Sequence, residues 1–152
     1  MTDHLVEVHR GPMLECRHRG HAVIWREGQG IIGAWGQPDL RILPRSSSKM
    51  IQALPLVESG AASGLSSAQL ALSCASHQGA AIHTGAVNSW LHDLGLSESD
   101  LRCGPQWPND EPARDVLILG GEAPTQCHNN CSGKHTGFLA LTKYLGAGPD
   151  NI

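Results

Sequence analysis

The apolar residues of this chain follow a strand pattern at the start and a helical pattern after Pro44, and that change limits the folds open to it. Four N-terminal runs have the length and composition of β-strands: residues 5–9, 13–18, 21–26 and 31–35. Turn sequences rich in glycine separate these runs. We therefore expect two short hairpins of one antiparallel sheet, followed by a short strand at residues 40–43.

The remainder of the chain predicts helices. One begins near Ser47, and its apolar residues at helical spacing are Met50, Ile51, Leu54 and Val57. Pro55 lies inside this helix and should kink or shorten it. Ser66 and Gln69 have the spacing of a capping box at the start of the next helix. Further helices are expected at residues 81–94 and 136–145, and residues 103–115 are expected to be irregular.

Composition excludes several classes of protein. The chain has 152 residues, enough for one buried core, and a net charge of −3 without a basic run, which argues against a nucleic-acid binder. No run approaches the ~18 apolar residues of a membrane span, and the charged N-terminus is unlike a secretory signal. Five irregularly spaced cysteines do not form a disulfide framework, so we expect a reducing, cytoplasmic setting.

Ser46 and Lys49 form a Ser-x-x-Lys motif at the mouth of the first expected helix. Residues three apart on a helix share a face, so the amine can reach the hydroxyl. A serine hydroxyl is a poor nucleophile until a base removes its proton, and a buried, unprotonated lysine can be that base. Ser47 and Ser48 lack this geometry. The alternative is a serine helix cap followed by a solvated lysine.

Ser76, His77 and Gln78 form a second polar cluster, where a short helix ends in a loop. An amidohydrolase needs a nucleophile, a base, an oxyanion site and a proton donor for the leaving amine. Ser76 is a candidate for the hydroxyl that relays a proton between Lys49 and the departing nitrogen. The alternative is that Ser76 only bonds to the end of its helix.

The third cluster precedes the last expected helix. Cys131, Lys134 and His135 have i, i+3 and i+4 spacing, so they share a face if the helix starts this early. Cysteine and histidine are the usual zinc ligands, so a four-ligand zinc site is an alternative for Cys127, His128, Cys131 and His135. The alternative is a polar helix start with buried thiols.

Four motifs together resemble the asparaginase II family of Rhizobium etli type. They are Pro44 to Lys49, Cys74 to Gly79, Cys103 to Gln106 and Asn129 to Gly137, and the opening Val6 to Gly11 fits as well. The motifs occur in the order of the family, and the likeness covers nearly all of the chain.

The resemblance implies an α+β fold like that of the penicillin-binding proteins and serine β-lactamases, with an antiparallel sheet packed on a helical region. It implies hydrolysis of L-asparagine to L-aspartate and ammonia by a homodimer. Ser46 corresponds to the nucleophile, Lys49 to its base and Ser76 to the second serine. Cys131 and Lys134 match positions that hold a modulatory zinc ion. Because family members are about twice as long, residues 1–152 are expected to be the N-terminal part of one catalytic domain and to be inactive alone.

Four further residues are candidates for substrate binding: Arg45, His77, Asn130 and His135. The guanidinium of Arg45 suits the α-carboxylate of asparagine, although a surface arginine is the alternative. Two other functions stay open. One is a β-lactamase-like or esterase-like serine hydrolase, and the other is a zinc-stabilised module without enzymatic activity.

Overall fold

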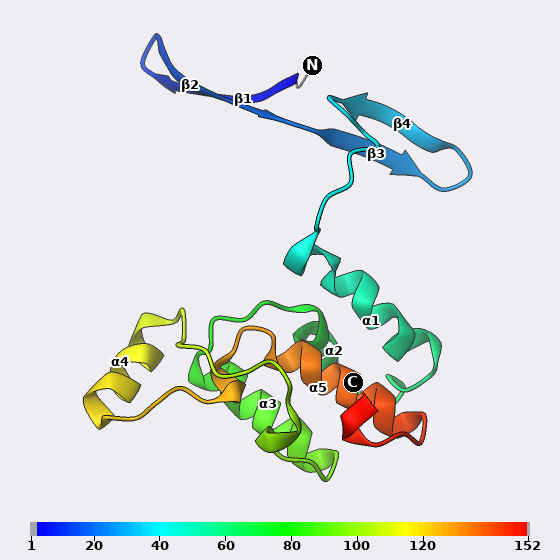
Figure 1. Ribbon diagram of the computed structural model, residues 1–152, viewed down its shortest axis with the longest axis vertical. Helices are drawn as coiled ribbons and strands as arrows, with labels where there is room; N and C mark the ends of the chain where they lie inside the picture. The colour runs from blue at the N-terminus through cyan, green and yellow to red at the C-terminus, as the bar shows by residue number, and fades with distance from the viewer. Residues whose placement is uncertain (1–2, 152) are drawn as a thin grey trace. The chain divides into compact units, whose positions relative to one another are not determined.

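The chain folds into two compact units, Met1–Leu43 and Pro44–Ile152, each described here by itself. The structure is a computed structural model that describes residues 3–151. Its first unit contains two small antiparallel sheets and its second contains five α-helices (Figure 1). The α+β class is therefore confirmed.

The first unit has the four expected strands. They are β1 (Asp3–Arg10), β2 (Met13–Gly20), β3 (Ala22–Arg26) and β4 (Gly30–Trp35). β1 pairs with β2 and β3 with β4, so the hairpins are two separate two-stranded sheets, and the prediction of one sheet was wrong. Only His21 separates β2 from β3, and that link is too short for the chain to reverse into a hairpin. The prediction of a strand at residues 40–43 was also wrong, because these residues are in neither of the two sheets.

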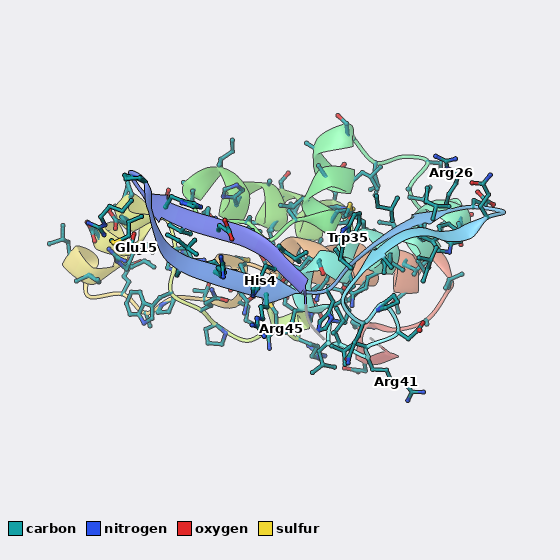
Figure 2. All side chains as sticks on the ribbon, turned by 90° about the horizontal axis from the view of Figure 1, so that it is seen from above. His4, Glu15, Arg26, Trp35, Arg41 and Arg45 are labelled. Atoms are coloured by element: carbon teal, nitrogen blue, oxygen red, sulfur yellow. The ribbon has the colours of Figure 1, made fainter. Side chains whose placement is uncertain are left out.

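The described residues of the first unit form no apolar core of their own. No described side chain between residues 4 and 43 is buried, and Trp25 is 64% exposed. In Figure 2 Arg26 lies at the turn of the β3–β4 hairpin and Trp35 near its open end, with side chains on both faces of the ribbon. Two-stranded hairpins are marginally stable in water by themselves.

The second unit is helical. Its helices are α1 (Lys49–Glu58), α2 (Ser67–Cys74), α3 (Ala81–Asp93), α4 (Glu111–Gly120) and α5 (Ser132–Tyr144). Short 3₁₀ turns occur at Arg45–Ser48, Glu98–Asp100, Gln126–His128 and Pro149–Asn151. Within residues 3–151, no helix combines the length and apolar character that crossing a bilayer requires.

The predicted start of α2 is confirmed in atomic detail. The Ser66 hydroxyl accepts a hydrogen bond from the backbone N–H of Gln69 at 3.2 Å, and the Gln69 side chain accepts one from the Ser66 N–H at 2.9 Å. This reciprocal pair is the capping box that the sequence spacing indicated.

Two helix boundaries differ from expectation. Residues 111–115 were expected to be irregular, but α4 begins at Glu111, where the Asp110 carboxylate accepts from the Ala113 N–H at 3.0 Å. Asp110 is thus an N-cap, and Pro112 occupies a position in the first turn that needs no N–H partner. α5 starts at Ser132 rather than Thr136.

Two glycines allow α5 to lie unusually close to α2. A Cβ atom on Gly133 would stand 2.4 Å from Cγ of Leu72, and one on Gly137 would stand 2.9 Å from Cβ of Ser73. α5 also contacts α1 and α3, so it forms the centre of the helical unit (Figure 1). The core around it consists of Leu56, Leu72, Val87, Trp90, Leu91, Leu101, Cys127, Leu139 and Ala140.

α1 presents a different face to this core from the one its large apolar residues predict. Its buried residues are Lys49, Ala53 and Leu56, whereas the four residues expected to form its apolar face are exposed: Met50, Ile51, Leu54 and Val57. The helix also runs three residues past Pro55. As a consequence, the lysine of the Ser-x-x-Lys motif points into the protein.

Candidate functional site

The Lys49 side chain joins the first and second polar clusters. It is 2% exposed, and its Nζ donates to Oγ of Ser76 at 2.6 Å and to the carbonyl oxygen of Ala75 at 2.8 Å. Lys49 forms no ion pair with any described carboxylate. A buried amine bonded only to neutral oxygens is unusual, because an unpaired charge is costly to bury.

Ser46 has the only hydroxyl of its serine triplet that is not bonded to the protein. Ser47 Oγ donates to the carbonyl of Pro44, and Ser48 Oγ donates to the carbonyl of Arg45 at 2.8 Å. Ser46 is exposed, and its Oγ makes no hydrogen bond with any described residue. Ser46 and Lys49 are bonded through the backbone, because the Lys49 N–H donates to the Ser46 carbonyl. The Ser46 hydroxyl and the Lys49 amine are not hydrogen-bonded to each other.

Arg45, directly before Ser46, has a strained backbone. Its φ is +52°, and it is the only described residue other than glycine with a positive φ. Left-handed backbone at such a residue costs roughly 1–2 kcal/mol and is concentrated at functional sites. The Arg45 side chain is exposed, and its guanidinium has no partner among residues 3–151.

Ser76 borders a cavity of about 440 Å³. Ser76, His77 and His83 contribute its polar wall, while α2 contributes alanine and leucine side chains. The segment that carries Ser76 follows the end of α2 and is extended, with φ and ψ of −88° and 155° at Ala75. Ser76 itself is exposed, so its hydroxyl is open to a molecule in this cavity.

His77 is buried, and both of its ring nitrogens have partners within the chain. Nδ1 accepts from the Gly79 N–H at 3.1 Å, and Nε2 lies 2.8 Å from Oγ of Ser132. Burial, with smaller contributions from the charges of His83 and Lys49, lowers the pKa of His77 to about 4. The ring is therefore neutral at pH 7.

Asn130 and His135 retain unused polar atoms. The Asn130 carbonyl accepts from the His77 N–H, but its side-chain amide bonds to no described residue. Nδ1 of His135 is buried without a partner in the described part of the chain. Burial, and then the charges of Lys134 and Lys49, lowers the pKa of His135, so this ring is neutral as well.

The described residues do not assemble a zinc site. Within residues 3–151, no three His, Cys, Asp or Glu side chains lie together as metal ligands would, so the four members of the alternative zinc site do not gather. Cys131 and Lys134 supply two donors where zinc usually takes four. The Lys134 amine lies over the Phe138 ring, 5.7 Å from its centre.

The other half-buried and buried thiols near this cluster are held in the protonated form. Burial raises the pKa of Cys103 to about 11 and that of Cys127 to about 12. The Cys127 thiol also donates to Oδ1 of Asn88 at 3.1 Å. Because the thiolate is the reactive form, neither residue is a candidate nucleophile.

Sequence reasoning missed two groups that position the site. The Ala75 carbonyl shares the Lys49 amine with Ser76, and Ser132 bridges His77 to the Cys127 carbonyl. Ser132 lies inside the third polar cluster, so its type and position gave a signal. The Ala75 carbonyl is a backbone group and gave none.

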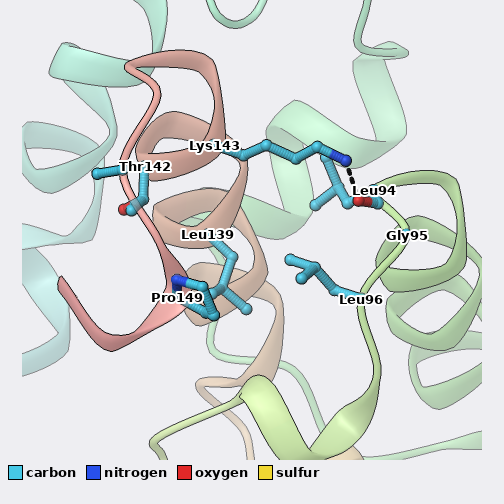
Figure 3. Close-up of a pocket in the computed structure, with 8 residues that line it drawn as sticks. Leu94, Gly95, Leu96, Leu139, Thr142, Lys143 and Pro149 are labelled. Carbon is cyan, nitrogen blue, oxygen red and sulfur yellow. Dashed lines mark hydrogen bonds between the residues drawn. The ribbon is translucent and has the colours of Figure 1, made fainter.

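A second cavity, of about 230 Å³, lies where the end of α3 approaches α5 (Figure 3). Leu94, Leu96 and Leu139 line it, and the Lys143 amine donates to the Leu94 carbonyl. Its lining contains no serine, cysteine or carboxylate side chain, whereas the cavity beside Ser76 has polar side chains in its wall.

Comparison with known proteins identifies the family of this chain. A search of the curated proteins finds no match to this chain. The family model of L-asparaginase II matches residues 6–151, which is nearly the whole length. This span includes Ser46, Lys49 and Ser76. The chain therefore belongs to the L-asparaginase II family.

Proposed function

We propose that this chain carries the serine and lysine machinery of an amidohydrolase that converts L-asparagine to L-aspartate and ammonia through an acyl-enzyme. The observation that supports it most is the buried Lys49 amine, 2.6 Å from the Ser76 hydroxyl and one helical turn from the unbonded Ser46 hydroxyl. Family membership suggests the substrate. The Rhizobium etli type is part of the proposal because the motifs that resemble it in this sequence contain Ser46, Lys49 and Ser76.

The reaction begins when Lys49, in its unprotonated form, accepts the Ser46 proton. A rotation of the free Ser46 side chain brings its Oγ toward the amine. Ser46 Oγ then attacks the side-chain amide carbon of asparagine, and backbone N–H groups near Ser46 stabilise the oxyanion. Ser76, already bonded to Lys49, passes a proton to the leaving ammonia. Water cleaves the resulting β-aspartyl ester and releases aspartate.

Substrate recognition is assigned to polar groups that the protein leaves unbonded. Arg45 offers an exposed guanidinium for bidentate binding of the α-carboxylate. The Asn130 amide and Nδ1 of His135 offer hydrogen bonds for the amino and amide groups. His77 contacts the substrate directly only if one of its two ring bonds is exchanged.

The remaining family properties stay predictions. They are a β-lactamase-like arrangement of the fold, a homodimer, a cytoplasmic location and modulatory zinc at Cys131 and Lys134. We also propose that residues 1–152 form part of a larger catalytic domain. The coreless first unit and the exposed apolar face of α1 support this, because both leave apolar surface in water.

Replacement of the nucleophile tests the proposal in the full natural chain. Ser46→Ala should lower the rate of ammonia release from L-asparagine by several orders of magnitude. Ser48→Ala is the matched control, since its hydroxyl bonds only to the Arg45 carbonyl, and it should retain activity. Unchanged turnover in folded Ser46→Ala protein would reject the assignment.

The competing serine-hydrolase function is tested on the same proteins. A β-lactamase-like or esterase-like enzyme would hydrolyse a chromogenic β-lactam or ester faster than it releases ammonia from asparagine. If the wild type hydrolyses the β-lactam or ester but not asparagine, and Ser46→Ala loses that activity, Ser46 remains the assigned nucleophile and the assigned substrate is wrong.

A further inference from the structure

Ser76 depends on its neighbours for position, because it belongs to no helix or strand. α2 ends at Cys74 and α3 begins at Ala81, and the backbone is extended at both Ala75 and Ala80. Among residues 3–151, the only hydrogen-bond partner of the Ser76 side chain is the Lys49 amine, from which it accepts. Two backbone bonds help to hold this segment: the Ala75 carbonyl accepts from Lys49 at 2.8 Å, and the Gln78 carbonyl accepts from the Asp110 N–H at 2.9 Å.

His77 anchors the same segment through both its backbone and its side chain. It is 4% exposed, and it connects the segment to the start of α5 at two points. Its backbone N–H donates to the Asn130 carbonyl at 3.2 Å, and its Nε2 lies 2.8 Å from Ser132 Oγ. Its Nδ1 also closes a local ring with the Gly79 N–H at 3.1 Å.

The hydrogen-bond network determines which ring nitrogen carries the proton. The Gly79 N–H can only donate, so Nδ1 is the acceptor and Nε2 carries the hydrogen. Nε2–H then donates to Ser132 Oγ, which itself donates to the Cys127 carbonyl at 3.0 Å. This order gives both ring nitrogens of His77 and the Ser132 hydroxyl a partner of the right kind.

The surroundings of His77 also keep its ring from exchanging protons near neutral pH. The titratable groups that face it are His83, stacked at 5.1 Å between ring centres, and Lys49. Burial and both of these groups disfavour the imidazolium form. A ring that is neutral and bonded at both nitrogens is suited to holding a segment in place rather than to transferring a proton.

We propose that His77 is a positioning residue that holds the Ser76 oxygen against the Lys49 amine by tying the Ser76 segment to Ser132 at the start of α5. This rests on the proposed function, in which Ser76 transfers a proton to the leaving group. Displacement of a reacting group by about 1 Å can cost about 100-fold in rate. The effect of losing the anchor should therefore appear in kcat.

Two substitutions at His77 test its two side-chain hydrogen bonds one at a time. The amide of His77→Gln reaches far enough to donate to Ser132, whereas that of His77→Asn is placed to accept only from Gly79. In the full natural chain, we expect His77→Asn to lower kcat about 100-fold with KM changed much less. His77→Gln should recover most of that loss, and His92→Gln, an exposed histidine replaced on α3, should match the wild type.

Two additional measurements distinguish positioning from other roles. Nitrogen NMR of the wild-type chain should show a neutral His77 ring with hydrogen on Nε2 between pH 6 and 8. The pH profile of kcat in His77→Gln should keep the wild-type shape, because His77 is not a titrating catalyst. A lost acidic limb, or hydrogen on Nδ1, would overturn the inference.

The failures of the two proposals are distinguishable. A wild-type protein that releases no ammonia from asparagine rejects the proposed function. An active wild type with kcat unchanged in folded His77→Asn rejects the positioning role alone. If His77→Asn has a lower melting temperature and a normal kcat per folded molecule, unfolding accounts for the lost activity. His77 then contributes to stability only, and the inference is overturned.

Discussion

The burial of Lys49 allows its contribution to stability to be measured separately from the catalytic role proposed for it. Its amine bonds to Ser76 and Ala75 but to no described carboxylate. Burial of an amine that has no ionised partner costs free energy of desolvation, and an apolar side chain of similar volume removes that cost. Lys49→Met should therefore abolish ammonia release and leave the melting temperature equal or higher.

The comparison variant for Lys49→Met is Lys143→Met, because Lys143 is exposed and bonds only to the Leu94 carbonyl. It should retain activity. Thermal melts and ammonia assays on both variants check the prediction. A large loss of stability in Lys49→Met would show that the two hydrogen bonds of the amine hold α1 in place.

His77 gives the stability of the helical unit a dependence on pH. Burial lowers the pKa of His77 to about 4 from an ordinary 6.5, so between these values the unfolded chain binds a proton that the folded chain does not. Stability is therefore full above pH 6.5 and falls as the pH drops toward 4, by at most about 1.4 kcal/mol per pH unit for this group. Urea unfolding of the wild type and His77→Gln at pH 7 and pH 4.5 measures it. The variant should lose less stability at pH 4.5, and an equal loss would contradict the prediction.

At the scale of single elements, one local helix-start signal predicts the structure, a second was misinterpreted, and contacts between elements were not predicted. The capping box of Ser66 and Gln69 involves neighbours in sequence, so the sequence predicted it. Asp110 and Pro112 carry equally local helix-start signals, but a run of acidic and proline residues also favours a loop, and that prediction was wrong. The buried face of α1 depends on how closely α2 and α5 approach, which favours Ala53 over larger apolar residues.

The close contact of α2 and α5 predicts opposite effects for two glycine substitutions. Gly133→Ala places a methyl group 2.4 Å from Cγ of Leu72 and 2.7 Å from its carbonyl oxygen, so α5 must shift. We expect a loss of about 1–3 kcal/mol in the free energy of unfolding. Gly85→Ala in α3 meets nothing within 4 Å and should gain about 1 kcal/mol from helix propensity. Denaturant unfolding measures both, and equal stability of the two variants would show that α5 yields without cost.

At the scale of the whole molecule, the two units differ in the amount of apolar surface that each buries. The helical unit has a continuous apolar core, while the described residues of the first unit bury no side chain. The strands could be predicted because their alternation is local. The separation of the two hairpins into two sheets could not be predicted from this alternation. It depends on whether β2 pairs with β3, and only His21 links these strands. The contact of Lys49 with Ser76, 27 residues apart, likewise depends on the packing of α1 on α2.

The metal dependence of stability separates an asparaginase from a zinc-stabilised module. The core of the helical unit is apolar, and no three His, Cys, Asp or Glu side chains among residues 3–151 lie together as metal ligands would. A folded state held by such a core does not need a metal, whereas a zinc-stabilised module unfolds when its metal is removed. We therefore expect EDTA to leave the melting temperature of the 152-residue chain unchanged. A melting temperature that falls with EDTA and recovers with added zinc would contradict this and favour the module, and the same treatment of Cys131→Ser would show whether that thiol is a ligand.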